Sequence, residues 1–131
     1  MKQSTIALFG ESEKGEYRTP HILHNVPQLH DRIGSPPEDS LGIFYAIQAL
    51  FHHDILLFFR VREEGFSYGD YLSGVKLLDE HWPDLAAICL PGVGDSEIIE
   101  AVIPVCEHHH SILIISEADL YDYLTESNVF G

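Results

Sequence analysis

The sequence is short of cysteine and has no long apolar run. Its two cysteines, Cys89 and Cys106, are too few for a disulfide framework. No segment approaches the roughly 20 apolar residues of a membrane span, and the apolar run near the N-terminus is too short for a signal peptide. These absences predict a cytoplasmic protein with no membrane partner.

Basic residues are also scarce, since 7 lysines and arginines face 21 acidic residues and the formal net charge is −14. A surface this acidic repels the phosphate backbone of nucleic acids. We therefore expect no nucleic-acid partner. A basic protein partner or a bound cation is compatible with this charge.

What remains is ordinary for a folded globular protein. The chain has 131 residues, of which 45% are hydrophobic and 21% charged. A chain of this length can bury a sizeable core, and the commonest domain size is about 100 to 150 residues. We predict a single domain over residues 1–131.

Four mostly apolar runs without polar alternation predict buried strands at residues 6–9, 54–61, 85–90 and 111–115. Helical patterns cover residues 27–33, 36–52, 68–81, about 96–106 and 117–125. This alternation predicts an α/β fold, a Rossmann-like parallel four-stranded sheet with helices on both faces. In such a fold the strand-to-helix loops share the carboxyl edge of the sheet, where ligands bind.

Three helix starts carry local capping signals. Ser35-Pro36-Pro37-Glu38 has the Ser-x-x-Glu spacing of a capping box, with proline in the first helical turn. Residues 67–70 are a variant of the same pattern, and Ser116 precedes the last helix with an aspartate three residues later. These signals predict helices beginning near residues 36, 68 and 117.

The loop after the first strand is acidic and contains Gly10 and Glu11. Gly10 and Gly15 have the spacing that begins a Walker motif. The lysine and hydroxyl residue that should follow are replaced by Glu16 and Tyr17, so the loop is not a P-loop.

The loop after the second strand contributes Arg60 and Arg62. Alternation along a strand end points both side chains the same way, and together they would bind a phosphate or a carboxylate. The alternative is a structural one, in which both arginines form ion pairs with the neighbouring Glu63 and Glu64.

The third loop contains Gly92 and Gly94 directly before a helix, where backbone amides can approach an anion. Asp95 or Ser96 would cap that helix, and Glu97 lies in its first turn. Helix capping without any ligand accounts for the same residues. The fourth loop offers the same two interpretations, with Ser116 as a ligand-binding or a capping residue.

The stretch LPGVGDSEIIE resembles the strand-end motif of the SLOG superfamily, the Rossmann-like group that includes the "lysine decarboxylase-like" cytokinin-activating phosphoribohydrolases. That motif is similar to Pro-Gly-Gly-x-Gly-Thr-x-x-Glu, with glycines on a phosphate and a catalytic glutamate. Pro91, Gly92 and Gly94 match when one glycine is deleted, Asp95 replaces the threonine, and Glu97 falls near the glutamate position. The first strand and its glycine, IALFG, are also similar in kind. The resemblance implies phosphate binding at Gly92 and Gly94 and a catalytic role for Glu97.

Histidines and cysteines give no motif. His108, His109 and His110 precede the fourth strand and so lie at the amino edge of the sheet. Neighbouring residues diverge along the backbone, and the spacing is not a recognised zinc type. We therefore predict a surface loop and no metal site. Cys89 and Cys106 fall in a strand and on an apolar helical stripe, where thiols are inert.

Two function classes remain open. The first is a small-ligand domain or hydrolase for a nucleotide or phosphoribosyl compound. Glu97 or Glu11 would then act as the catalytic carboxylate, and the ligand would contact Gly10, Arg60, Arg62, Gly92, Gly94, Asp95 and Ser116. The second is a non-enzymatic, acidic assembly module that binds itself or a protein partner. A small sheet with two exposed edges and no complete catalytic motif favours the second class and a homo-oligomer; whether there is any enzymatic activity or cofactor stays open.

Overall fold

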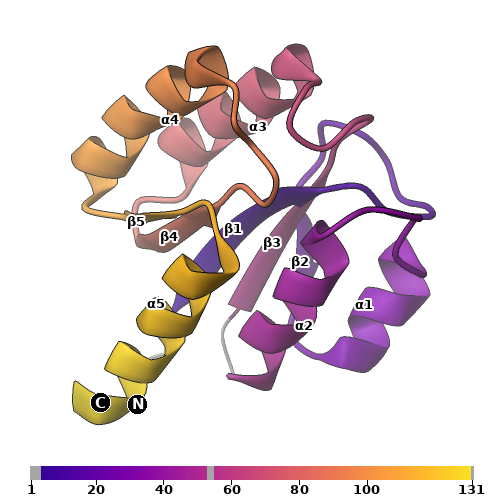
Figure 1. The fold of residues 1–131 in the computed structure, drawn as a ribbon, viewed down its shortest axis with the longest axis horizontal. Coiled ribbons are helices and arrows are strands. Elements are labelled where there is room, and N and C mark those ends of the chain that lie inside the picture. Colours follow the sequence, from indigo (N-terminus) through magenta and orange to yellow (C-terminus); the bar gives the residue numbers. More distant parts are fainter. Residues whose placement is uncertain (1–3, 53–54, 131) are drawn as a thin grey trace.

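One sheet forms the centre of the structure, a computed structural model that describes residues 4–52 and 55–130. In these residues five strands have the order β2-β3-β1-β4-β5 (Figure 1). They are β1 (Thr5–Gly10), β2 (His21–Leu23), β3 (Ile55–Arg60), β4 (Leu85–Cys89) and β5 (Ile112–Ile114). Four of them run parallel, and β2 pairs antiparallel with β3.

The predicted α/β class is confirmed, and the predicted sheet of four parallel strands needs correction. The additional strand, β2, lies in a stretch with no apolar periodicity, because three residues are too few to show one. Its Ile22 pairs with Leu57 at the edge of the sheet, and Leu23 reaches the core. Asp54, the predicted start of the second strand, lies outside the described residues.

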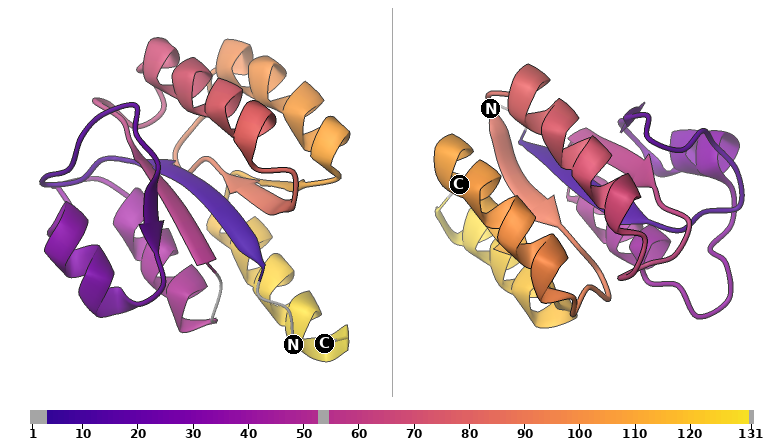
Figure 2. Two further views of the ribbon diagram at one scale, coloured as in Figure 1. Left: turned by 180° about the vertical axis from the view of Figure 1, so that it is seen from behind. Right: turned by 90° about the horizontal axis from the view of Figure 1, so that it is seen from above.

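Helices cover both faces of the sheet (Figures 1 and 2). On one face lie α1 (Val26–Ile33), α2 (Gly42–Phe51) and α5 (Glu117–Phe130), and on the other α3 (Tyr68–His81) and α4 (Ser96–His109). The last helix, α5, extends beyond its predicted end near residue 125, and α4 continues through Pro104 to His109. None of the helices in the described residues combines the length and apolarity needed to cross a membrane.

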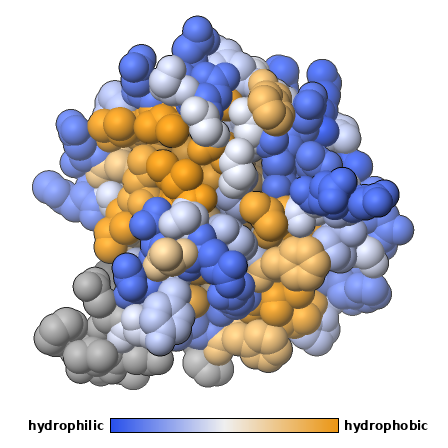
Figure 3. Space-filling model, in the orientation of Figure 1, coloured by the Kyte–Doolittle hydropathy of each residue, from blue (hydrophilic) through white to orange (hydrophobic). Residues whose placement is uncertain are grey.

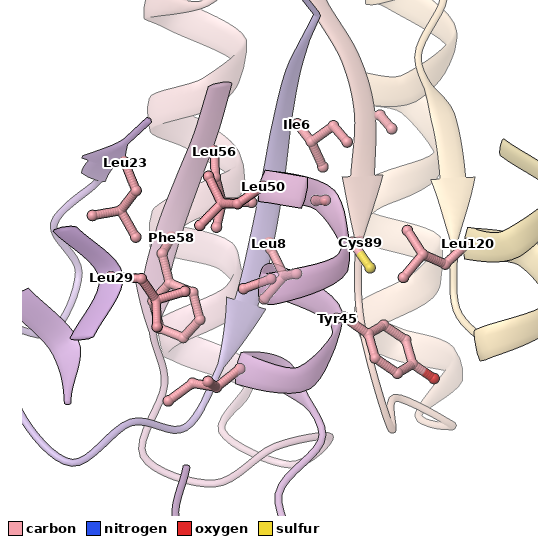
Figure 4. Close-up of a cluster of buried hydrophobic side chains, with 14 of the residues drawn as sticks. Ile6, Leu8, Leu23, Leu29, Tyr45, Leu50, Leu56, Phe58, Cys89 and Leu120 are labelled. Atoms are coloured by element: carbon pink, nitrogen blue, oxygen red, sulfur yellow. The ribbon is translucent and has the colours of Figure 1, made fainter. Parts of the chain in front are cut away.

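The central strands are apolar throughout because each serves two cores. In β1, Ile6 and Leu8 face the helices α1, α2 and α5, whereas Ala7 and Phe9 face α3 and α4. Figure 4 shows the first core, in which Leu8 of β1 lies beneath α2. Leu120 of α5 lies on the side of this core that includes Cys89. Successive side chains of a strand point to opposite faces, so a strand covered on both faces shows no polar alternation.

The predicted capping box at residues 35–38 is wrong. The helix begins at Gly42 instead, and Ser40 Oγ donates a hydrogen bond to Pro37 O at 2.6 Å. The first amides of α2 donate to the carboxylate of Glu64, which lies 22 residues along the chain from Gly42. The start of α5 is as predicted, because Ser116 Oγ accepts from the Asp119 amide at 3.1 Å.

Candidate functional site

The carboxyl edge between β1 and β4 is the position at which the topology favours a ligand. From β1 the chain continues to β3 on one side, then crosses to β4 on the other side. Strand order therefore reverses at β1, and ligands of open α/β sheets bind at such a reversal. Gly10 is the last residue of β1, and the loop that carries Gly92 follows β4.

The side chain of Glu64 lies at this edge and accepts three backbone hydrogen bonds. Its Oε2 accepts from Glu11 N at 2.8 Å and from Gly42 N at 3.1 Å, and its Oε1 accepts from Leu41 N at 2.9 Å. In return, Glu64 N donates to Glu11 Oε2 at 2.9 Å. Amides from a glycine loop and a helix N-terminus are the donors that bind phosphate in related architectures. Here the protein's own carboxylate takes them.

A close contact between two glycines makes this arrangement possible. A Cβ atom at Gly10 would lie 2.8 Å from Gly42 Cα and 3.2 Å from Glu64 Oε2. No side chain fits at either position without moving backbone. The end of β1 therefore approaches the start of α2 closely enough for one carboxylate to bond both segments.

The next residue, Gly65, adds a contact with the loop that follows β4. Its backbone has φ +88°, and an added Cβ would lie 2.7 Å from Gly92 O. Gly65 N donates to the buried Tyr71 hydroxyl at 2.8 Å. Burial raises the pKa of Tyr71, so the hydroxyl stays protonated. Glu64 and Gly65 together join the loops of β1, α2 and β4, and we call these two residues and their contacts the carboxyl-edge closure.

Arg60 and Arg62 lie beside one aromatic ring. Their guanidinium carbons are 4.4 and 5.5 Å from the centroid of Tyr17. Arg60 also donates to Gly15 O at 2.7 Å and to Glu13 O at 3.3 Å. The two side chains share a direction, as strand alternation predicts, and Arg60 fixes the loop after β1 rather than pairing with Glu63 or Glu64.

Asp70 is a buried carboxylate, which the sequence pattern predicts only as the last residue of a capping-box variant. It is 4% exposed. Its Oδ1 accepts from Arg18 Nε at 3.2 Å, and its Oδ2 accepts from Arg62 N at 3.0 Å. Asp70 thus holds the loops after β1 and β3 to the first turn of α3.

Two of the other predicted site residues, Asp95 and Ser116, cap helices with their side chains. Asp95 Oδ1 accepts from Glu97 N at 2.8 Å, and Glu97 is exposed in the first turn of α4. Ser116 caps α5. Gly94 has open surroundings, since an added Cβ would meet nothing within 4 Å. The structure therefore brings Gly10, Glu11 and Gly92 to the closure and leaves Asp95, Glu97 and Ser116 at the starts of their helices.

No family model, curated protein or solved structure matches the chain. The resemblance to the SLOG superfamily therefore depends on residues 90–100 and on the first strand alone. In the structure, Pro91 to Asp95 form a turn between β4 and α4, with Gly92 at φ +76°. Asp95, at the position of the motif's threonine, caps α4 with its side chain.

Proposed function

We propose that the protein is a non-enzymatic assembly module with a Rossmann-like scaffold, which acts by pairing with a second copy of itself. The observation that carries this proposal is the outer side of α2. There Leu41, Phe44 and Phe51 are 43%, 52% and 72% exposed. Figure 3 shows apolar side chains gathered over α2. The helix contains no charged residue over residues 42–51.

The charge of the protein favours a second copy at this surface. Two chains of net charge −14 repel each other across most of their surfaces. An uncharged helix face is a place where copies can approach, and a two-fold axis brings the same residues together from both. Fully burying a phenylalanine side chain contributes about 1.5 to 3 kcal/mol. Four such side chains in a dimer offset a large part of the cost of association, roughly 4 to 15 kcal/mol. A dimer at micromolar concentration requires a net gain of about 8 kcal/mol, so we expect further contacts beside α2, including Leu41, to contribute to the interface.

The carboxyl-edge closure supports the non-enzymatic part of the proposal. An anionic ligand between the loop after β1 and the start of α2 would have to displace the Glu64 carboxylate from three amide donors. It would also meet the carboxylate of Glu11, which lies against Glu64 N. Both effects oppose phosphate binding at this position.

Sedimentation equilibrium tests the assembly directly. The protein should be a dimer at micromolar concentration, and the double variant Phe44→Ser/Phe51→Ser should be a monomer with unchanged circular dichroism. Phe66→Ser is the matched control, because Phe66 is 70% exposed but lies outside α2, and it should remain a dimer. A monomeric native protein, or equal loss of the dimer in the control, would refute the proposal.

The alternative is a binding domain or hydrolase for a nucleotide or phosphoribosyl compound at the Gly92 to Glu97 turn. The open surroundings of Gly94 favour it, because a ligand can reach the backbone there. A thermal-shift screen of nucleotides and sugar phosphates separates the two functions. A ligand at 100 times its dissociation constant adds about 2.7 kcal/mol. A rise in melting temperature that is lost in Gly94→Val and kept in Arg60→Ala would indicate a ligand at this turn and favour the alternative.

A further inference from the structure

An aspartate and two histidines meet at the ends of α3 and α4, opposite the carboxyl edge. Asp79 lies in the last turn of α3, and His108 and His109 end α4. Asp79 Oδ1 is 2.9 Å from His108 Nδ1 and 3.0 Å from His109 Nε2. The two helices lie side by side on one face of the sheet (Figures 1 and 2).

Two neighbouring histidines reach one oxygen because they use different ring nitrogens. Successive side chains of a helix point about 100° apart, which argues against a shared partner. His108 uses Nδ1, the nitrogen near its backbone, whereas His109 uses Nε2, the far nitrogen. The rings then lie with their centroids 4.7 Å apart and their planes tilted by 57°. The expectation that these residues diverge does not hold for this pair.

The ring of His109 is held in an orientation that suits a metal ligand. Its side chain is only 6% exposed. Its second nitrogen, Nδ1, lies 3.4 Å from Pro83 O, which can accept an N–H hydrogen bond. Metal-binding histidines are commonly oriented in this way, with one nitrogen donating to a carbonyl and the other free for the ion. Without an ion, an N–H at His109 Nε2 donates to Asp79. When the proton is on Nδ1 instead, the lone pair of Nε2 points toward the same place and is free for an ion.

The surrounding charge favours a cation. Both α3 and α4 direct their C-terminal ends, the negative ends of their dipoles, toward the cluster. No lysine or arginine follows Lys76 in the sequence, whereas eleven of the 21 acidic residues do.

We propose that Asp79, His108 and His109 bind a divalent transition-metal ion of the zinc type. Two imidazole nitrogens and one carboxylate oxygen are donors that select such ions over magnesium and calcium. The three donor atoms lie within 4.8 Å of one another. Ligand atoms on a tetrahedral ion with bonds of about 2.1 Å lie about 3.4 Å apart, so small side-chain rotations complete the set.

A position for a further ligand is available beside this cluster. His109 also lines an open depression of about 460 Å³, together with Thr5, Asp84 and Leu85. An ion held by three protein donors keeps an open coordination position, which water fills in zinc sites of this type. Solvent reaches the cluster because the side chains of Asp79 and His108 are 43% and 70% exposed.

Cobalt titration of the full chain tests the site, because Co²⁺ takes zinc positions and absorbs visible light when bound by protein nitrogen. We expect saturable binding of one ion per chain and displacement of the cobalt spectrum by Zn²⁺. Affinity should fall by at least about tenfold in Asp79→Asn and His109→Ala. His108→Ala provides a variant outside the core, since that side chain is 70% exposed, and it should show the same loss.

Two controls allow for the other histidines of the chain. His110→Asn keeps a residue that tolerates the left-handed conformation at φ 56°, and His81→Ala removes an exposed ring at the end of α3. Both should bind cobalt as the native protein does. Affinity unchanged in Asp79→Asn and His108→Ala, or lost equally in the controls, would overturn the proposal, as would absence of saturable binding.

Discussion

At the residue scale, the side chain of Glu64 joins segments that are far apart in the chain. Its carboxylate accepts amides from residue 11 and from residues 41 and 42. Hydrogen bonds to a charged acceptor contribute more than those to a neutral one. The β1 loop and the start of α2 therefore depend on one side chain.

Glu64→Gln should lower the free energy of unfolding by about 1.5 to 3 kcal/mol, the range for hydrogen bonds to charged groups. Glutamine keeps the shape but has one acceptor oxygen and no charge, and we expect the lower part of the range because Glu64 is half-buried. Urea denaturation measures the difference. Glu63→Gln is the matched control, since Glu63 is exposed and should change stability little. Equal effects of both substitutions would contradict the role given to Glu64.

Asp119 gives a pH-dependent prediction. Hydrogen bonds from Ile115 N and Ser116 N lower its pKa in the folded state. A lowered pKa means that the stabilisation is fully present above the unfolded value of about 4 and is lost as the pH falls through the folded value. Asp119→Asn should therefore be less stable than the native protein at neutral pH, and the difference should shrink in acid. Thermal unfolding between about pH 7 and about pH 2 measures it. A difference that is constant with pH would show that the carboxylate charge plays no part.

At the element scale, the start of α2 is decided by the contact between Gly10 and Gly42. Replacing glycine by alanine within a helix normally stabilises it by about 0.5 to 1 kcal/mol. At position 42 the same substitution should destabilise the protein, because the new Cβ would lie 2.8 Å from Gly10 Cα. We expect Gly42→Ala to cost about 1 to 3 kcal/mol, typical of overpacking.

Gly69→Ala is the comparison for this substitution. Gly69 occupies the second position of α3, and an added Cβ would meet only the flexible end of Arg18, at 3.3 Å. Chemical denaturation should show a neutral or small stabilising effect there. A stable Gly42→Ala protein with unchanged circular dichroism would contradict the close approach of β1 and α2.

Elements with strong local signals were predictable from the sequence. The runs that became β1, β3 and β4 are apolar because each faces two cores, and α5 begins where Ser116 and Asp119 cap each other. The strand β2 was missed because only Leu23 of its three residues is buried. The start of α2 was misplaced because its amides are satisfied by a residue distant in sequence, so a local motif gave the wrong position.

The candidate site was less predictable than the fold for the same reason. Sequence reasoning placed Gly10, Glu11 and Gly92 at one edge of the sheet from topology alone, and the structure brings these loops together through Glu64 and Gly65. The partners of Glu64 lie 22, 23 and 53 residues away, a relation with no local pattern. The cluster at Asp79 depends on helix packing and on which ring nitrogen each histidine uses, and a single sequence gives neither.

At the scale of the whole molecule, charge and apolar surface oppose each other in the proposed dimer. Each copy has a net charge of −14, whereas the outer side of α2 is uncharged. Salt screens repulsion between exposed charges, with a Debye length of about 10 Å at 0.1 M. It leaves apolar contacts between phenylalanine side chains largely intact.

The dimer should therefore become tighter as salt is added. Sedimentation at about 0.01 M and about 0.3 M sodium chloride should show a larger dimer fraction at the higher concentration. Phe44→Ser/Phe51→Ser should be a monomer at both. A dimer that weakens with salt would indicate pairing through ion pairs instead of through α2.

The carboxyl-edge closure also bears on how this scaffold can change during evolution. Here three amide donors already converge on one point, and a single side chain satisfies them. Replacing Glu64 by a small neutral residue would free these donors between a glycine loop and a helix N-terminus, and a neutral residue in place of Glu11 would remove the second carboxylate that opposes an anion there. These two substitutions would thus open the scaffold to phosphate, at the cost of the stability that Glu64 provides.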